Sequence, residues 1–583
     1  MNSPDYVELA DANDIAEPHG GLSVLDIVSA GPQAGLSPAH LETAGLIYGL
    51  ALAPAATARV LVIGCGTGWD VLAFACAHPN AQVAGLDANA EAIAQAQTNA
   101  AALALGNASF YVADVSALEP ETGEFDYILA PAVYGKVDSG QSAALTRACR
   151  ENLSPSGIAV VGYDTYPGCK AGDIVRDAML LHGRSASSAE ELVQSARAAL
   201  SLFSEGLSSE HPYAQAIGIV VAGVKEQSDD TLARNYLMGE GVACYFVDFA
   251  DQMHNAGLAY VGDAEPEKEL PAAFGNHVSL TNSLMALGQS KIIRQQYLDF
   301  SVGRSHRKSM LVHVERGADV RMSPDLSCLR ALRLAAALKR TPGQYVNSTA
   351  AFFQTPDGRE FEATDAMVER ASDVFAQVWP FSLTFDDLVA LLPTNDARPR
   401  DAAHANAVFA AVERLYRLGV MQVRAQAGMA DESDAAALQL VPGLHDAVRS
   451  TGDAADRLAW FNTFQQSVGV LFTDARRLVM LHIDGAHSFE GLCAALLAAI
   501  KRGNIASIRA VGDVDRIARA VVVRLIEDLR HAGLVLGGSG AWVNHYRAVL
   551  KTIAPGDTDW LPFLDCLYWH ARRVEGEVAP VSR

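Results

Sequence analysis

The stretch Arg59-Val-Leu-Val-Ile-Gly-Cys-Gly-Thr-Gly68 decides the fold that the sequence predicts. Its first five residues are mostly apolar and end at a glycine, a pattern typical of a buried parallel strand. A helical pattern follows over Trp69–Ala77, so the three glycines occupy the turn between a strand and a helix. Glycine suits this turn because a side chain there would collide with a ligand that passes close to the backbone.

Strand and helix patterns alternate along the chain after this turn. Short apolar runs that end in glycine or aspartate are separated by longer amphipathic stretches. This order predicts βαβ units and therefore an α/β fold with a doubly wound parallel sheet. The predicted strands are Arg59–Ile63, Gln82–Asp87, 109–114, 125–129 and 157–162, and the predicted helices are 36–52, Trp69–Ala77, 90–104 and 142–152.

A helical insertion is predicted to interrupt this sheet. Residues 171–240 are helical by pattern, and the alternation then resumes with a helix over Phe246–Asn255. Leu258–Asp263 and 307–313 are predicted to be two more strands of the same sheet. The basic stretches 291–294 and 304–308 are interpreted as solvated helix faces.

The alternation stops beyond residue 317, where a mixed α+β part begins. The order helix, helix, strand recurs within 325–440 and 470–540, and this order resembles a winged-helix unit. We expect these winged-helix-like units to contact protein rather than DNA, because the whole chain is acidic. The segment 425–437 is predicted to be a linker.

Composition excludes several classes of protein. The chain has 583 residues, and 45 Lys and Arg against 67 Asp and Glu give a formal net charge of −22, which argues against nucleic acid as the main partner. The N-terminus lacks the features of a signal peptide, and no apolar run is long enough to predict a membrane span. Eight scattered cysteines without a CxxC pair predict reduced thiols. We therefore expect a cytoplasmic protein without a membrane span.

The glycine-rich turn distinguishes between nucleotide-binding motifs. Trp69 stands where a GxGxxG dinucleotide motif needs glycine, and no Gly-Lys-Ser/Thr of a Walker loop is present. A GxGxG turn with an acidic residue at the end of the next strand resembles the S-adenosylmethionine (SAM) site of class I methyltransferases. The resemblance implies that Asp87 accepts hydrogen bonds from the ribose hydroxyls, that Asp114 accepts from the adenine amino group, and that Val115 lines the ring. Each aspartate could instead cap the turn that follows it.

One residue departs from the class I pattern. These enzymes usually carry Asp or Glu two residues before the first glycine, and this chain has Val62 there. Asp70 is the nearest substitute carboxylate. The cofactor-binding residues expected from the motif are Gly64, Cys65, Gly66, Gly68, Asp70, Asp87, Ala88, Asp114 and Val115.

Several further motifs resemble bacterial methyltransferases that bear a methyltransferase regulatory domain, a group that includes the rickettsial-type protein lysine methyltransferases. The matching motifs are Phe125-Asp-Tyr-Ile128, Val133-Tyr134, Tyr163-Asp-Thr-Tyr-Pro-Gly168, Cys244-Tyr-Phe-Val-Asp-Phe249, Arg307-Lys-Ser-Met-Leu311 and Leu478-Val-Met-Leu-His-Ile-Asp-Gly485. The resemblance implies a class I core, a helical insertion used for dimerisation, and methyl transfer to a lysine amine of a protein. The implied segments are a lid over 1–35, the core over 36–170, the insertion over 171–245, completion of the sheet over 246–316, a middle domain over 317–437 and a C-terminal domain over 438–583.

The resemblance also suggests the residues of the methyl acceptor site. Tyr134 and Asp164 are the candidate catalytic residues, with Tyr134 orienting the amine and Asp164 accepting its proton or hydrogen bond. Tyr163 and Tyr166 are the candidate substrate-binding residues. Here the chain departs from the family, since Asp164 and Cys169 replace the usual Asn and Trp. Each of these side chains could instead be structural.

Three functions are therefore compatible with the sequence. The first is SAM-dependent N-methylation of lysines in a protein, which yields S-adenosyl-L-homocysteine. The second is methylation of a small molecule, and the third is a SAM-binding interaction scaffold without catalysis. Sixteen scattered histidines give no metal-ligand spacing, so no metal is expected. A methyl acceptor is the expected partner, with a homodimer as an option and no nucleic acid.

Overall fold

The fold is that of a computed structural model, which describes residues 35–537 apart from ten internal gaps. The gaps are 132, 136, 208–211, 238–240, 342–350, 364, 393–401, 433–436, 451–456 and 507–513. The lid predicted over 1–35 lies almost wholly outside the described residues, as does Cys566. The other seven cysteines are free, as expected.

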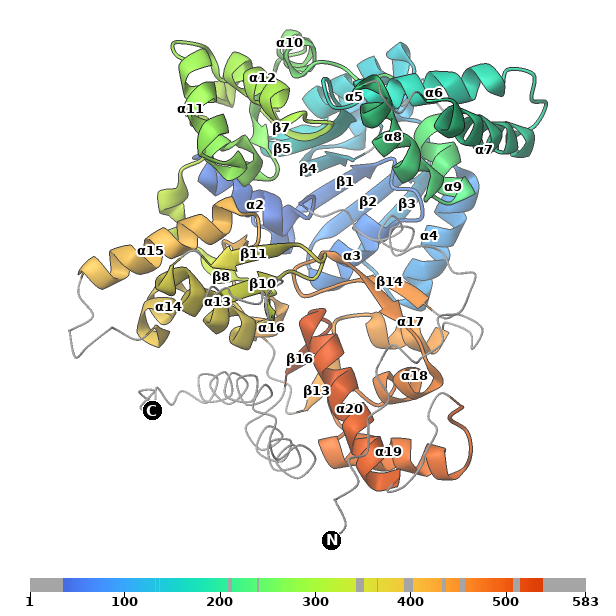
Figure 1. The fold of residues 1–583 in the computed structure, drawn as a ribbon, viewed down its shortest axis with the longest axis vertical. Coiled ribbons are helices and arrows are strands. Elements are labelled where there is room, and N and C mark those ends of the chain that lie inside the picture. Colours follow the sequence, from blue (N-terminus) through green and yellow to red (C-terminus); the bar gives the residue numbers. More distant parts are fainter. Residues whose placement is uncertain are drawn as a thin grey trace.

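A seven-stranded sheet forms the centre of the molecule (Figure 1). Its strand order is β3-β2-β1-β4-β5-β7-β6. Strands β1 to β5 are parallel, whereas β7 is antiparallel to both β5 and β6. The strands are β1 (Arg59–Ile63), β2 (Gln82–Asp87), β3 (Ala108–Val112), β4 (Phe125–Ala130), β5 (Leu153–Asp164), β6 (Leu258–Asp263) and β7 (His306–His313). The predicted doubly wound sheet is thus confirmed, and all seven predicted strands belong to it. The sheet is mixed rather than wholly parallel, because β7 runs antiparallel to both of its neighbours.

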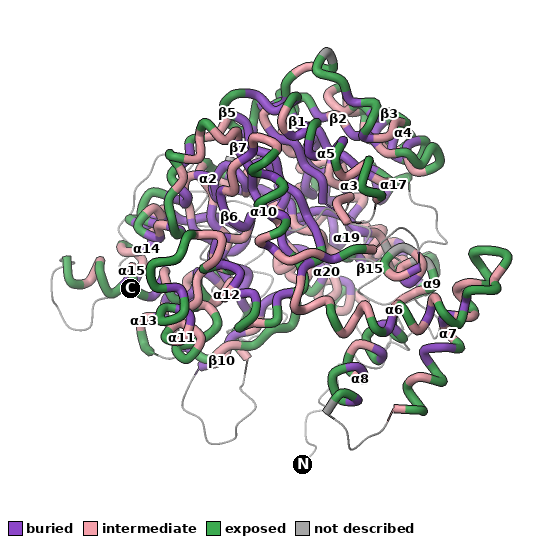
Figure 2. The backbone as a smooth tube through the Cα atoms, turned by 90° about the horizontal axis from the view of Figure 1, so that it is seen from above, coloured by how far each residue is buried: buried purple, intermediate pink, exposed green. Residues whose placement is uncertain are grey.

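Alternate residues of each central strand enter two different cores. In β1, Val60 and Val62 pack with helices α2, α3 and α4, whereas Leu61 and Ile63 pack with α5 and α10 on the other face. Both faces are buried because helices follow the parallel strands on both sides. These helices are α2 (Pro38–Ile47), α3 (Trp69–Ala77), α4 (Ala90–Ala102), α5 (Ser139–Glu151) and α10 (Phe246–Asn255). Figure 2 shows the strands as the most deeply buried part of the chain.

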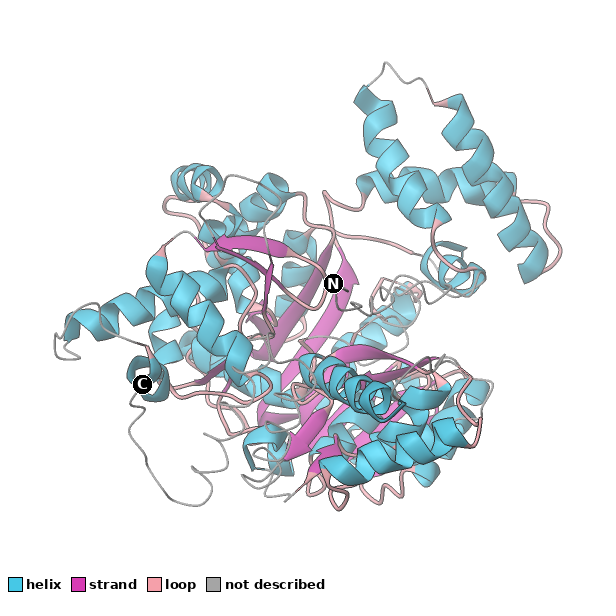
Figure 3. Ribbon diagram, turned by 60° about the horizontal axis from the view of Figure 1, so that its bottom comes forward, coloured by secondary structure: helices cyan, strands magenta, loops and turns pink. Residues whose placement is uncertain are grey.

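The insertion between β5 and β6 is helical, as predicted. Its helices α6, α7 and α8 pack around their own small core, which includes Val175, Leu200 and Val221. They form a group that stands away from the rest of the molecule (Figure 3). The elements are α6 (Lys170–His182), α7 (Ala189–Gly206), α8 (Pro212–Lys225), α9 (Asp229–Leu232) and a π-helical turn over Ala233–Leu237.

The basic stretches 291–294 and 304–308 are not simply solvated helix faces, and that prediction is wrong. Two helices, α11 (Asn276–Met285) and α12 (Lys291–Val302), precede β7. Arg307 of β7 is buried and forms a bidentate pair with Asp299 of α12, with bonds of 2.8 and 2.7 Å. The Lys291 ammonium donates to backbone carbonyls of Val261 and Arg321. Buried charges are stable when they are paired in this way, and the pairs attach α12 to the edge of the sheet.

The middle part and the C-terminal part of the chain share one arrangement of strands and helices. In the middle part, β8 pairs with β12, and Leu334 of β8 bridges Leu383, which lies just before two helices. In the C-terminal part, β13 (Leu438–Leu440) pairs with β16 (Val535–Gly537), and Gln439 of β13 bridges Asp484, which also lies just before two helices. The predicted order helix, helix, strand is therefore present in both parts. The elements of the middle part are β8 (Arg333–Ala335), β9 (Lys339–Thr341), β10 (Ala351–Gln354), β11 (Glu360–Ala363), α13 (Ala366–Val378), α14 (Phe385–Leu391), α15 (Ala402–Arg417) and β12 (Gln422–Arg424).

One continuous hydrophobic core joins the middle and C-terminal parts. The boundary predicted at residue 437 therefore does not separate two cores. The segment 425–437, where it is described, is packed, because Ala425 donates to Thr43 and Asp431 accepts from Ser382. The prediction of a free linker there is wrong. The elements after it are α16 (Met429–Glu432), β13 (Leu438–Leu440), α17 (Leu444–Ser450), β14 (Arg457–Phe461), β15 (Ser467–Leu471), α18 (Asp474–Met480), α19 (Phe489–Lys501), α20 (Val514–His531) and β16 (Val535–Gly537).

Within the part of the chain that the structure describes, we find no helix with the length and apolar character needed to cross a membrane.

Candidate functional site

The loop from Gly64 to Gly68 connects β1 to α3 at the carboxyl edge of the sheet. All three glycines have positive φ, at 72°, 52° and 83° for Gly64, Gly66 and Gly68. A Cβ on Gly68 would lie 2.6 Å from the Phe110 ring, and one on Gly64 would lie 2.5 Å from Val133. A Cβ on Gly66 would meet no atom within 4 Å, so this residue faces open space. The outer glycines thus allow close packing, and the middle one leaves room for a ligand.

Asp87 ends β2 and is joined to this loop. Its Oδ2 accepts a hydrogen bond of 2.8 Å from the Gly66 N–H, and its Oδ1 accepts one of 2.8 Å from Asn89. Ala88 follows it on the exposed side. The structure therefore brings the predicted carboxylate and the predicted loop together at one point.

Asp114 follows β3, beside the buried Val115. Its Oδ1 accepts from the Ser116 N–H at 2.8 Å, and its Oδ2 accepts from the side-chain amide of Gln141 at 2.5 Å. The hydrogen bonds, first of all the one from the Ser116 backbone, lower the pKa of this carboxyl. Asp114 therefore caps the turn over Val115–Ala117, which is the structural alternative considered for it. Gln141 was not expected from the sequence, because its position in the first turn of α5 gives no local sequence pattern.

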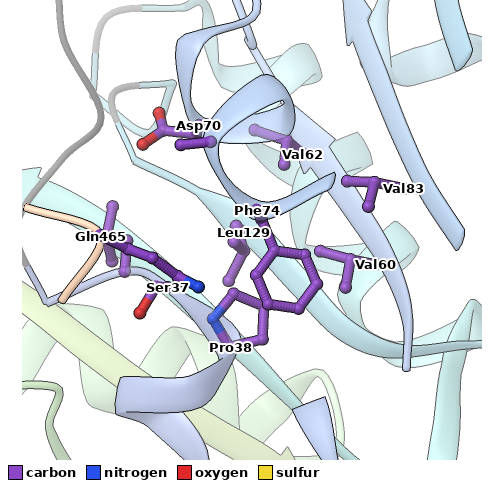
Figure 4. Close-up of a pocket in the computed structure, with 11 residues that line it drawn as sticks. Ser37, Pro38, Val60, Val62, Asp70, Phe74, Val83, Leu129 and Gln465 are labelled. Atoms are coloured by element: carbon purple, nitrogen blue, oxygen red, sulfur yellow. The ribbon is translucent and has the colours of Figure 1, made fainter. Parts of the chain in front are cut away.

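Val62 and Asp70, which precede and follow the loop in sequence, line the same small cavity (Figure 4). The cavity volume is about 10 Å³, room for about one water molecule. Gln465, from the turn between β14 and β15, also lines it, so the C-terminal part reaches this cavity. The Trp69 and Trp460 rings meet edge to face at 5.6 Å in the same junction. No sequence pattern identified this long-range contact.

Cys65 contributes backbone rather than a reactive side chain. Its side chain is buried, and burial raises the pKa of the thiol to about 12, so the side chain remains a neutral thiol. Its backbone N–H donates to the carbonyl of Leu86 at 3.1 Å, as does that of Gly64 at 2.8 Å. These bonds fix the loop to β2.

Tyr134 lies beyond the end of β4. We call the region of Tyr134, Tyr163, Asp164 and Tyr166, which the sequence predicts to meet the methyl acceptor, the acceptor side. Its hydroxyl donates to the side-chain oxygen of Gln252 at 2.6 Å, and burial raises the pKa of this hydroxyl. Its ring meets those of Tyr163 and Phe249 edge to face, at 5.8 and 5.1 Å. Gln252, in the middle of α10, was not expected from the sequence.

Tyr163 is a core residue in this structure. Its ring stacks on Phe249 at 4.0 Å, it is 2% exposed, and its hydroxyl is 3.1 Å from the Ser309 hydroxyl. The expected contact of Tyr163 with substrate therefore has no support in its position. Its observed contacts hold the Tyr134 ring in place.

Asp164 and Tyr166 lie at the open end of β5. The Asp164 carboxylate lies 3.0 Å from Nδ1 of His306 on the neighbouring strand β7, and its side chain is 55% exposed. The Tyr166 hydroxyl donates to Asp173 at 2.7 Å. His306 was missed because its strand lies far along the chain. An exposed carboxylate and a tyrosine ring therefore lie close together at this end of β5.

The loop, the carboxylates and the open space above Gly66 together fit an adenosyl cofactor. Gly66 would allow it close to the backbone, Asp87 could accept from two hydroxyls of a ribose, and Val115 offers an apolar wall to a ring. Within the described residues we find no group of three or more His, Cys, Asp or Glu that could hold a metal ion.

Two family models match the chain. Residues 60–157 match a methyltransferase domain, and residues 228–313 match a predicted methyltransferase regulatory domain. The first match contains the loop, Asp87, Asp114 and Tyr134. The second covers α10, β6, α12 and β7, which support the acceptor side.

Curated and solved relatives extend the match. An uncharacterized protein of Rickettsia prowazekii, RP789, is 27% identical over 287 residues, which are 48% of this chain and 51% of that protein. A second uncharacterized protein of that organism, RP028, is 27% identical over 216 residues, which are 37% of this chain and 86% of that protein. The chain thus spans about half the length of the first of these relatives. The structure of PKMT2 from Rickettsia typhi in complex with AdoHcy covers 87% of this chain and 99% of its own, with a TM-score of 0.72 and 19% identity, which shows the shared fold.

Proposed function

Because this chain carries a SAM-dependent methyltransferase domain and a methyltransferase regulatory domain, we propose that it methylates lysine side chains of a protein substrate. One observation carries the proposal. The glycine loop, Asp87 and Asp114 follow successive strands at the carboxyl edge of the sheet, where β5 also ends in the exposed carboxylate of Asp164. An exposed carboxylate suits a lysine that is presented by a protein, whereas a small metabolite needs a closed cavity.

The residues of the cofactor side have separate roles in this proposal. When bound, SAM supplies a methyl group on a sulfonium centre. Asp87 would hold the ribose, Asp114 and Val115 the adenine, and Asp70 would serve the amino acid end in place of the acidic residue that Val62 replaces. The shared cavity of Val62 and Asp70 supports this substitution, because it places a carboxylate next to the apolar residue.

The residues of the acceptor side would prepare the lysine amine. Tyr134 is held by Gln252 and by two aromatic rings, so its hydroxyl has a fixed orientation. Asp164 would attract the incoming ammonium and accept its proton, with His306 as the adjoining base or proton relay. In methyl transfer by in-line displacement, most of the rate acceleration comes from holding the amine in line with the methyl group that is transferred.

Calorimetric titration with SAM and S-adenosylhomocysteine tests the cofactor side. Asp87→Ala should weaken binding by about ten-fold or more, since a hydrogen bond to a charged group contributes roughly 1.5–3 kcal/mol. Asp126→Ala is the matched control, because Asp126 also accepts a backbone N–H, from Arg59 at 2.9 Å, but at the opposite edge of the sheet. No binding by the unmodified protein would refute the proposal.

Transfer of isotopically labelled methyl groups tests the acceptor. A lysine-rich polypeptide should be labelled and its fully acetylated form should not, because acetylation removes the nucleophilic amine. Cofactor binding without transfer to any amine would favour the interaction scaffold, which Val62 motivates. Label on small amines alone would favour a metabolite methyltransferase.

A further inference from the structure

A row of three aromatic rings lies on the surface next to the acceptor side. It consists of Tyr166, Tyr245 and Phe300, and we call it the aromatic row. The ring centroids of Tyr166 and Tyr245 are 5.3 Å apart, and those of Tyr245 and Phe300 are 5.8 Å apart. Phe300 is 51% exposed, and the two tyrosines are half-buried. The three rings come from the turn before α6, the start of α10 and the last turn of α12.

An ammonium group already lies on the aromatic row. Nζ of Lys170 is 3.4 Å from the centroid of the Tyr166 ring and 5.5 Å from that of Tyr245. Both distances lie within the range in which the face of a ring attracts a cation. The Tyr166 hydroxyl donates to Asp173, and this bond to a carboxylate increases the electron density of the ring.

The backbone under Tyr166 is fixed by its neighbours. Thr165 donates to the carbonyl of Ser305 at 2.9 Å, Tyr166 to that of Cys244 at 3.0 Å, and Gly168 to that of Arg304 at 2.9 Å. A Cβ on Gly168 would lie 2.4 Å from the Gly303 carbonyl oxygen, so only glycine allows this close packing. A ligand would therefore meet a surface that is already ordered, which lowers the entropic cost of binding.

We propose that the aromatic row is a second lysine-binding subsite, which binds the trimethylated side chain of a lysine that lies near the target lysine on the same substrate. Lys170 occupies this subsite in the free protein. A quaternary ammonium donates no hydrogen bonds, so it loses little when an aromatic face replaces water. Tyr166 lies two residues beyond Asp164, so a protein held on the row stays at the acceptor side between successive transfers. The choice of ligand rests on the proposed function.

The test uses two probes that differ only in charge. They are Nα-acetyl-Nε-trimethyllysine methylamide and its neutral isostere with a quaternary carbon in place of the nitrogen, titrated into the full chain without cofactor and followed by ligand-observed NMR. The cation should bind about three-fold more tightly than the isostere, as expected for a partly exposed cation–π contact. Phe300→Leu should remove much of this preference, and this variant should fold because the ring is half exposed.

Variants of Lys170 test its role as the internal occupant. Lys170→Met should strengthen binding of the cation several-fold, because the competing ammonium is gone. Lys170→Arg, which keeps a cation on the rings, and Lys501→Met, which removes an exposed lysine of α19 far from the row, should leave the affinity unchanged.

Equal affinity for the two probes, or a preference that Phe300→Leu leaves intact, would overturn the proposal. This failure is distinct from failure of the proposed function, since the probe titration contains no cofactor. Failure of the proposed function would instead appear as absent S-adenosylhomocysteine binding in the same preparation.

Discussion

The cofactor side and the acceptor side of the site are built in different ways. The cofactor side comes from one continuous stretch, in which the loop Gly64–Gly68, Asp87 and Asp114 each follow a strand and are held by backbone bonds. On the acceptor side, Tyr134 depends on Gln252, 118 positions away, and Asp164 on His306, 142 positions away. The positions of the residues on the cofactor side are therefore determined by where successive strands end. Those on the acceptor side are determined by the packing of α10, α12 and β7. Changes that loosen those elements should affect acceptor chemistry while cofactor binding persists.

The largest expected effect is on the support of the acceptor side. Asp299→Ala leaves the buried Arg307 guanidinium without its carboxylate, and should lower the free energy of unfolding by about 3–5 kcal/mol. Asp373→Ala, which breaks an exposed pair with Arg340, should cost less than about 1 kcal/mol. Urea denaturation measures both, and calorimetry on the folded fraction should show unchanged cofactor affinity for Asp299→Ala. A cofactor affinity that falls with stability would show that the two sides are not independent.

Two glycines of the loop separate stability from binding on the cofactor side. Gly68→Ala places a Cβ against Phe110 and Ala96 at positive φ, and should cost at least about 2 kcal/mol of stability. Gly66→Ala meets open space, so its stability cost should be smaller, about 1–2 kcal/mol, while cofactor affinity should fall about ten-fold or more. Thermal unfolding and calorimetry distinguish the two. Normal cofactor binding by Gly66→Ala would contradict a ligand above this residue.

The helix that begins at this loop should make stability depend on pH. His78 caps the far end of α3 and lies 3.0 Å from the side-chain nitrogen of Gln465, and burial lowers its pKa from 6.5 to about 4. Between these two values the unfolded chain binds a proton that the folded chain does not, so stability should be lost as the pH falls from 6.5 towards 4. The loss should be roughly 3 kcal/mol. Urea denaturation at several pH values should show a shallower dependence for His78→Asn but not for His254→Asn, which changes an exposed histidine.

The smallest expected effect is that of removing the Tyr134 hydroxyl on the rate of methyl transfer. Tyr134→Phe removes one hydrogen bond, to Gln252, and should slow methyl transfer about five- to ten-fold, equivalent to about 1 kcal/mol. Cofactor affinity should not change, because Tyr134 belongs to the other side of the site. Tyr111→Phe, on an exposed tyrosine of β3, is the control. A Tyr134→Phe variant with full activity would assign the residue a purely structural role.

Elements whose structure depends on neighbours along the chain could be predicted from the sequence. The observed bounds of β1, α3, β2, α10 and β6 coincide with the predicted ones. Apolar residues that recur every two positions in a strand, or every 3.6 in a helix, indicate which face is buried. The position of a side chain could not be predicted where it depends on a partner that is distant in sequence. Arg307 resembles a surface cation in sequence, and only its pairing with Asp299 makes burial possible.

The cofactor half of the site was foreseeable for the same reason. Parallel strands end at one edge of the sheet, so residues that close successive strands must meet there. Gln141, Gln252 and His306 were not foreseeable, because each joins the site through a side chain whose strand or helix is placed by tertiary packing. Tyr163 shows the converse, since a motif residue expected to bind substrate is buried against the Tyr134 ring.

The sequence by itself determined the sheet, the glycine loop and the positions of Asp87 and Asp114, because strand order and turn chemistry are local properties of the chain. Only the tertiary structure decided which side chains surround Tyr134 and Asp164, that the middle and C-terminal parts share one core, and that Lys170 lies on the aromatic row. These features join residues far apart in sequence. Their geometry results from many packing and charge contacts at once. Contacts between residues that are distant in sequence leave no local pattern from which they could be predicted.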